Sequence, residues 1–218
     1  MKSNTCKLNE DLTCLKKVLD EVEKVTAYNG LEDKQALRLR LLAEELCGML
    51  PGLVENFSGE FWAENDGDNY ELHVELKAED MTLELRDEIL SVSKSGKNAA
   101  AIGVMGKIRA IAETMLLSAA DSSVPIPADE YYDYNGFNMG FGYIDPTLSC
   151  KSGYVYSWSL YNYKTAVEEN EADAYAELER SIVAKLADDI IVGVRGKNVE
   201  IVVKKSFGFL YDFIQGKQ

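Results

Sequence analysis

The sequence has few of the residues that hold structural metals or form disulfides. Among its 218 residues there is one histidine, His73, and four cysteines, none of them in a Cys-x-x-Cys pair. A structural zinc site needs four nitrogen or sulfur ligands at close spacing, so we predict no metal. We expect the cysteines to be reduced and to pack as small apolar side chains, as in a reducing compartment.

Long apolar runs and an excess of positive charge are also missing. No apolar stretch reaches the roughly 18 residues of a membrane-spanning helix, and residues 1–11 lack the apolar segment of a secretory signal. We therefore expect a cytoplasmic protein with no membrane partner. The net charge is −14, from 37 acidic and 23 basic residues. Such a charge repels phosphate backbones, so we expect no nucleic-acid partner.

Apolar residues at helical spacing predict two helices at the start of the chain. The first covers residues 8–28, and a turn over residues 28–33 follows it. The second covers residues 35–50. Pro51 ends it, because proline lacks the backbone N–H that a helix interior needs.

After Pro51 the apolar residues recur at every second position, which predicts β-strands. Residues 70–77 form the clearest strand, residues 57–63 its partner, and residues 65–69 the hairpin turn between them. One face of this hairpin is polar, which favours antiparallel pairing with helices on the other face.

The histidine lies on that polar face, where His73 stands between Glu71 and Glu75. We interpret it as a solvent-facing strand residue, because the sequence places no triad partner beside it. A role as a ligand or a base is the alternative.

Helices and strands continue through the rest of the chain. We predict helices at residues 82–92, 100–119 and 164–187, and strands beginning near residue 153 and covering residues 189–194 and 199–204. The pattern indicates a single domain over residues 1–218, with an N-terminal helix within residues 1–30 and a Tyr-rich insertion at residues 120–163. The predicted fold class is an α/β (α+β) two-layer sandwich, with a mixed, mainly antiparallel sheet and helices on one face.

The second helix carries two adjacent carboxylates, Glu44 and Glu45. At 100° per residue, Glu45 falls at the margin of the apolar stripe and Glu44 on the opposite side. A carboxylate at the margin of the core can have a raised pKa and act as a base. The alternative is that Glu45 faces water at the edge of the helix, near Arg38.

Residues 39–49 resemble the first conserved helix of the GHKL ATPases (gyrase, heat-shock chaperone, histidine-kinase and mismatch-repair types). The version in anti-sigma-factor serine kinases is the most similar. In that family the glutamate orients the attacking water, and an asparagine one turn later binds magnesium. The resemblance assigns the catalytic role to Glu45. Met49 stands in place of the asparagine, and its thioether is a poor ligand for Mg²⁺.

Two later motifs of the family are matched unevenly. Its adenine-reading Asp-x-Gly-x-Gly motif has no match at residues 76–81, where Leu76 takes the place of the aspartate. Residues 88–98 and 100–108 resemble the family's lid and the helix start that follows it. The resemblance implies that this segment holds phosphate. The residues concerned are Ser95, Gly96, Lys97, Asn98, Gly103 and Gly106. A surface loop before a closely packed helix is the alternative.

Aromatic residues are concentrated between Tyr131 and Tyr163. Exposed Tyr and Trp are typical of protein interfaces, so this region could bind a protein partner or form a homodimer. The alternative is that the rings cover one side of the sheet as a local core.

The resemblance implies an ATP-binding domain of GHKL type with a bacterial regulatory or signalling role. Because Met49 replaces the asparagine, we expect no Mg²⁺ and weak or absent hydrolysis, so not an active ATPase or kinase. The alternative function is a non-catalytic protein-interaction module that keeps the fold without nucleotide.

Overall fold

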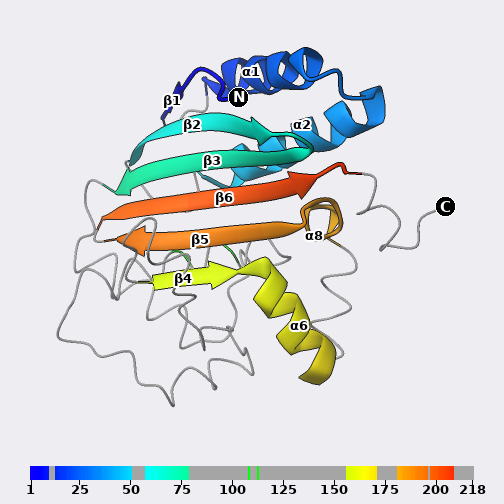
Figure 1. The fold of residues 1–218 in the computed structure, drawn as a ribbon. Helices are drawn as coiled ribbons and strands as arrows, with labels where there is room; N and C mark the ends of the chain where they lie inside the picture. The colour runs from blue at the N-terminus through cyan, green and yellow to red at the C-terminus, as the bar shows by residue number, and fades with distance from the viewer. Residues whose placement is uncertain are drawn as a thin grey trace.

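The computed structural model describes residues 1–9, 13–50, 57–78, 108, 112, 156–170, 181–195 and 197–208. They form an α+β fold, with an open six-stranded sheet in the order β1-β2-β3-β6-β5-β4 and helices packed against it (Figure 1). The strands are β1 (Cys6–Leu8), β2 (Phe57–Asp66), β3 (Asn69–Ala78), β4 (Tyr156–Ser159), β5 (Asp189–Arg195) and β6 (Asn198–Ser206). The helices are α1 (Leu15–Tyr28), α2 (Asp33–Met49), α6 (Leu160–Asn170) and α8 (Ile182–Leu186).

The predicted hairpins are confirmed. β2 and β3 pair through a tight turn at Gly67 and Asp68, where Gly67 has φ 59°, a left-handed conformation that glycine adopts without strain. β5 and β6 form the second hairpin. Each pair of neighbouring strands in the described sheet is antiparallel, so the parallel pairing implied by a mixed sheet is not found there.

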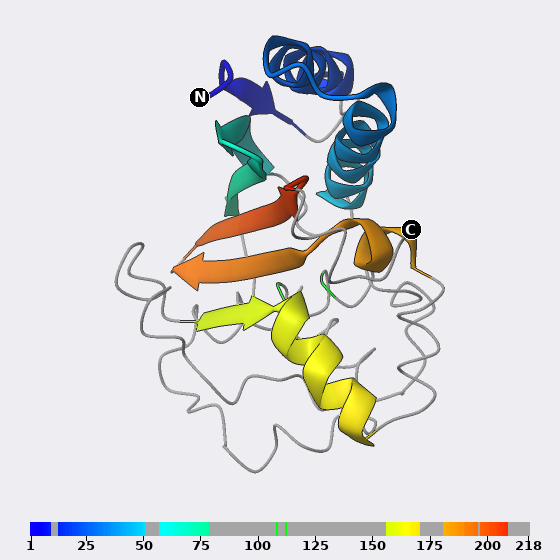
Figure 2. The ribbon, with the colours of Figure 1, turned by 45° about the vertical axis from the view of Figure 1, so that its right-hand side comes forward.

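The inner face of the sheet carries the apolar half of each alternating strand. Phe61, Leu72, Val74 and Ile201 are completely buried, and they share one core with buried residues of α1 and α2. Figure 2 shows these two helices on one side of the sheet. At Gly59 a Cβ atom would lie 2.7 Å from the backbone carbonyl oxygen of Glu75, which cannot move aside, so the close packing of β2 on β3 requires glycine there.

The second predicted helix is confirmed as α2. It begins with a capping box, in which the Glu32 and Gln35 side chains bond reciprocally to backbone N–H groups. Its C-terminal capping residue is Leu50, which directly precedes Pro51 in the sequence. Gly30, with φ 67°, allows the tight turn between α1 and α2.

The first predicted helix begins later than expected. It starts at Leu15, whereas Leu8 belongs to β1 and lies opposite Gly59 of β2. The prediction that this helix begins at residue 8 was wrong, because the β1 pairing partner is far away in the sequence and local periodicity cannot detect it.

The predicted helix at residues 164–187 also has different boundaries. α6 starts at Leu160, where the Asp189 carboxylate accepts hydrogen bonds from the Ser159 hydroxyl and the Tyr161 backbone N–H. A single helix cannot continue to residue 187, because Ser181 is extended (φ −77°, ψ 122°) and caps the separate helix α8.

Much of the predicted middle of the chain lies outside the described residues, including the helix at residues 82–92. Of the helix at residues 100–119, Ile108 and Ala112 are described, and both are helical and fully buried in the core. None of the described helices is both long enough and apolar enough to cross a membrane.

Candidate functional site

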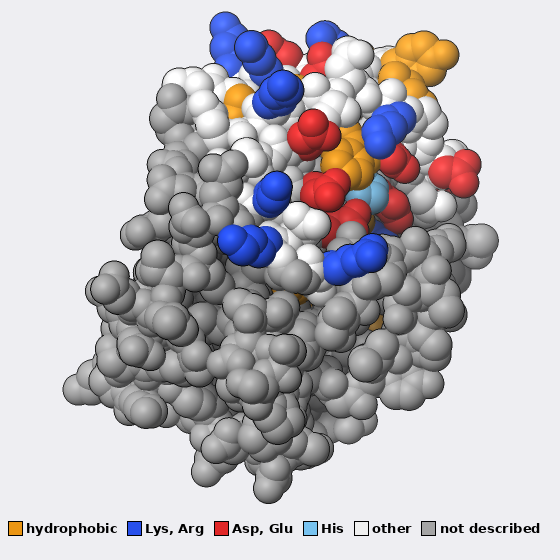
Figure 3. Space-filling model, turned by 90° about the vertical axis from the view of Figure 1, so that its left-hand side faces the viewer, with side chains coloured by type: hydrophobic (Ala, Val, Ile, Leu, Met, Phe, Trp, Pro, Cys, Tyr) orange, Lys and Arg blue, Asp and Glu red, His pale blue; other side chains and the backbone are white. Residues whose placement is uncertain are grey.

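The outer face of the β2–β3 hairpin brings charged and aromatic side chains together. The strand register places Trp62 opposite His73, Glu64 opposite Glu71, and Glu71 opposite Lys204 of β6. Figure 3 shows the result, with acidic side chains gathered around the imidazole of the chain's one histidine. We call Glu64, Glu71 and His73 the His73 cluster.

His73 is buried in this surface, so the prediction that it faces solvent was wrong. The residue is 9% exposed, and its ring stacks on Trp62 with centroids 4.9 Å apart and an interplanar angle of 5°. Its Nε2 lies 3.2 Å from Oε2 of Glu71, and its Nδ1 lies 3.6 Å from Oε1 of Glu200. Neither ring nitrogen makes a hydrogen bond with the described residues. The imidazole is therefore held between two carboxylates, with each ring nitrogen beside one carboxylate oxygen.

The surrounding carboxylates determine the ionisation of the cluster. Burial alone would lower the pKa of His73, but contacts with Glu200 and Glu71 and the charge of Glu64 outweigh it and raise the pKa to about 9. The contact with His73 lowers the pKa of Glu71. Both Glu71 and His73 are thus charged at neutral pH.

Glu64 is held in place by two further contacts. The indole N–H of Trp62 donates a hydrogen bond to Oε1 of Glu64 at 2.8 Å, and Nζ of Lys2 lies 3.2 Å from the same oxygen. Burial raises the pKa of Glu64, but these two contacts and the charge of His73 outweigh it and lower the pKa below its ordinary value. The ammonium group of Lys2 also lies 4.2 Å from the centroid of the Trp62 ring, in a cation–π contact.

The His73 cluster has the donors and the spacing of a small metal site. One ligand atom from each residue can be chosen so that all three lie within 4.8 Å of one another. Ligands of one tetrahedral Zn²⁺ ion stand about 3.3 to 3.6 Å apart, since the metal bonds are about 2.0–2.2 Å long. The 3.2 Å from Nε2 of His73 to Glu71 is close to this spacing, and Glu64 needs a small side-chain adjustment.

A groove of about 870 Å³ adjoins the cluster. Glu64 and Glu71 form part of its wall, as do Lys2, Lys204 and the exposed Tyr161. The side chain of Lys204 lies 3.6 Å from Oε1 of Glu71. Each of the two cluster carboxylates therefore has a lysine partner at the groove.

The described residues test little of the predicted GHKL-type site. Glu44 and Glu45 are both exposed on α2, which shares its core with Leu72 and Val74 on the inner face of the sheet, whereas His73 lies on the outer face. The exposure of Glu45 agrees with the alternative in which this side chain faces water. The six residues expected to hold phosphate, Ser95, Gly96, Lys97, Asn98, Gly103 and Gly106, lie outside the described residues.

Only the end of the predicted aromatic interface is described. Trp158 and Tyr163 are buried and contact each other, with ring centroids 5.9 Å apart. For these two rings the alternative of a local core is confirmed. Tyr161 is 64% exposed.

The sequence contained a signal for the His73 cluster that our interpretation did not use. Once the hairpin turn is placed at Gly67 and Asp68, the register sets Trp62 beside His73 and Glu64 beside Glu71. The cross-strand neighbours of His73, rather than its sequence neighbours, reveal the cluster.

Comparison with known proteins gives no further guidance, since no family model, curated protein or solved structure matches the chain.

Proposed function

We propose that the chain binds a divalent metal ion through Glu64, Glu71 and His73 on the outer face of the sheet. The observation that carries this proposal is the orientation of the imidazole: Nε2 lies beside Glu71, and Nδ1 lies beside Glu200. A histidine that binds a metal through one nitrogen commonly donates its other N–H to a carboxylate, which fixes the ring. Glu200 is in position for that role.

The donor set favours certain metals. One imidazole nitrogen and two carboxylate oxygens suit Zn²⁺ and Mn²⁺ better than Mg²⁺, which prefers oxygen ligands and water. Both carboxylates have lowered pKa values and are ready to coordinate, whereas His73 must first lose its proton. We therefore expect proton release when the ion binds.

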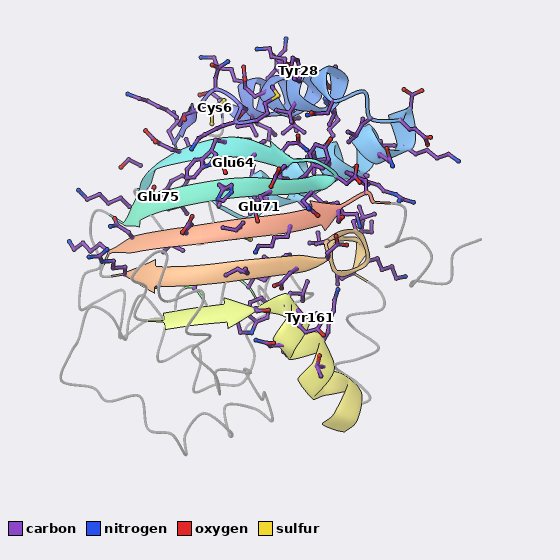
Figure 4. All side chains as sticks on the ribbon, viewed as in Figure 1. Cys6, Tyr28, Glu64, Glu71, Glu75 and Tyr161 are labelled. Carbon is purple, nitrogen blue, oxygen red and sulfur yellow. The ribbon has the colours of Figure 1, made fainter. Side chains whose placement is uncertain are left out.

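Calorimetric titration with Zn²⁺ and with Mn²⁺ tests the proposal, using protein that carries no added histidines. We expect saturable binding of one ion per chain, and an affinity lower by about 100-fold or more in Glu71→Gln. Glu75→Gln is the matched control, because Glu75 is exposed on the same strand and lies four residues from Glu71 (Figure 4). Equal binding by both variants would reject the site, as would the absence of saturable heat for wild type.

The second candidate is the GHKL-type nucleotide-binding domain with a bacterial regulatory role. It is favoured by the order along the chain of the three segments that resemble the family, residues 39–49, 88–98 and 100–108. In this proposal Glu45 orients water, the loop with Lys97 holds phosphates, and hydrolysis is weak or absent. The packing of α2 on an antiparallel sheet is compatible with it. The non-catalytic interaction module that keeps the fold without nucleotide is its alternative.

Titration with ATP and ADP, with and without Mg²⁺, separates these alternatives. Saturable binding that Lys97→Ala weakens supports the nucleotide site, and binding that this change leaves untouched rejects the phosphate loop. No heat at millimolar nucleotide rejects nucleotide binding and favours the interaction module.

A further inference from the structure

We propose that the metal-loaded His73 cluster binds a small oxyanion, a phosphate or carboxylate group, in the adjoining groove. This inference rests on the metal binding proposed above and adds the class of ligand that the site takes. It follows from the position of the groove and the number of protein ligands to the metal. It also follows from two lysines whose carboxylate partners would be taken up by the metal.

The position of the groove relative to the cluster is the first argument. Glu64 and Glu71 line the groove, whereas His73 does not. An ion held by all three side chains is therefore between the imidazole and the groove. Three protein ligands leave at least one coordination position for water or another ligand, as in catalytic zinc sites. That open position faces the groove.

The two lysines at the groove supply the second argument. Lys2 pairs with Glu64 at 3.2 Å, and Lys204 pairs with Glu71 at 3.6 Å. When both carboxylates coordinate an ion, their charge is neutralised by the metal, and the two ammonium groups are left beside it. An oxyanion on the open metal position can then accept hydrogen bonds from both lysines.

The groove wall has three other acidic residues: Asp66 is exposed to solvent, whereas Asp188 and Asp189 are already engaged within the fold. Asp188 pairs with Nζ of Lys205 at 2.7 Å, and it also accepts the backbone N–H of Ser206. Asp189 accepts hydrogen bonds from Ser159 and from the Tyr161 backbone N–H. Their charges are partly compensated within the fold, so they oppose an anion less than free carboxylates would.

The volume of the groove suits a small molecule. About 870 Å³ falls within the range of ordinary ligand pockets. Tyr161, which is 64% exposed, offers a ring surface on the same wall. The groove therefore suits a phosphate or carboxylate group attached to a compact organic body.

Titration of the full chain with inorganic phosphate and, separately, with acetate tests the inference, in the presence and absence of saturating Mn²⁺. We expect at least one of the anions to bind the Mn²⁺-loaded protein about ten-fold or more tightly than the metal-free protein. The comparison of the two anions identifies the preferred head group.

Lysine variants identify the groove as the place of binding. We expect Lys204→Met to weaken anion binding about ten-fold without weakening Mn²⁺ binding, and Lys2→Met to act in the same direction. Lys77→Met is the matched control, because Lys77 is exposed on β3 and does not line the groove. Equal anion binding by the Lys204 variant and the control would reject this place of binding.

The outcomes distinguish this inference from the proposed function. If Mn²⁺ binds but neither anion does, or if the anions bind equally well without metal, the inference is wrong and the metal site stands. If neither Mn²⁺ nor Zn²⁺ binds, the proposed function fails and the inference fails with it.

Discussion

The two faces of the central sheet carry different kinds of side chain, although the same strands form both. On the inner face Leu72 and Val74 of β3 are fully buried among apolar side chains of the helices. On the outer face Glu71 and His73 alternate with them, and His73 is 9% exposed yet surrounded by carboxylates. Burying apolar surface stabilises the fold, whereas burying a charged imidazole has a cost that its partners must offset. The inner face therefore explains why the chain folds, and the outer face is where a ligand is expected.

The largest effect should come from the inner face. Phe61 is completely buried at the centre of β2, and Phe61→Ala should lower the free energy of unfolding by about 3–5 kcal/mol through lost burial and the cavity left behind. Urea denaturation measures this loss. Glu60→Ala, one residue away on the outer face and exposed, should change stability by less than about 0.5 kcal/mol. Similar losses for both variants would mean that the two faces are not distinct.

The protonation of His73 should give the largest effect from the outer face. Its pKa is raised from 6.5 to about 9, so the protonated form stabilises the fold. This stabilisation is complete below about pH 6.5 and is lost as the pH rises through about 9. The shift corresponds to on the order of 3 kcal/mol.

Urea denaturation of metal-free protein across this pH window measures the effect of His73. His73→Gln should lack this part of the pH dependence, although other groups that titrate in the window still contribute. A wild-type curve with the same slope as the variant would show that the carboxylates do not stabilise the imidazolium.

Much of the difference between the two faces could be predicted from the sequence. The inner face follows from the alternation of Leu72 and Val74 with charged residues, and Gly67 indicates the hairpin turn. These signals are local. The start of α1 was misplaced because Leu8 pairs with Gly59, and α6 was misplaced because Asp189 caps it from a distant strand. Such long-range contacts leave no periodic pattern in the residues that make them.

The candidate site was harder to predict for the same reason. The hairpin of β2 and β3 supplies Trp62, Glu64 and Glu71 around His73. Glu200 beside the ring and Lys204 beside Glu71 come from β6, far along the chain. Without that pairing, Glu71, His73 and Glu75 resemble any solvent-facing strand. The register of the sheet, not the residue types alone, turns them into a cluster.

A smaller effect should identify the carboxylate that orients the ring. Glu200→Gln removes the charge beside Nδ1 of His73 and should weaken metal binding about 10- to 100-fold without removing a metal ligand. Glu60→Gln is the control, because Glu60 is exposed at the other end of the same cross-strand row. Calorimetric titration with Zn²⁺ measures both. An unchanged affinity in Glu200→Gln would assign the orientation of the ring to stacking on Trp62 alone.

The smallest effect should come from Lys2. Its side chain is 52% exposed, and its ion pair with Glu64 and cation–π contact with Trp62 are both at the surface. Lys2→Met should therefore lower the free energy of unfolding of the metal-free protein by at most about 1 kcal/mol. A loss of several kcal/mol in urea denaturation would show instead that Lys2 anchors the N-terminal segment to β2.

The most direct test of the metal site is proton–nitrogen correlation NMR of the imidazole, because His73 is the only histidine in the chain. Titration with Zn²⁺ near neutral pH should convert the imidazolium into a neutral ring that keeps its proton on Nδ1 and coordinates through Nε2. The change should saturate at one ion per chain and require about 100-fold more Zn²⁺ in Glu71→Gln. An imidazolium signal that persists unchanged at millimolar Zn²⁺ would contradict the proposed site.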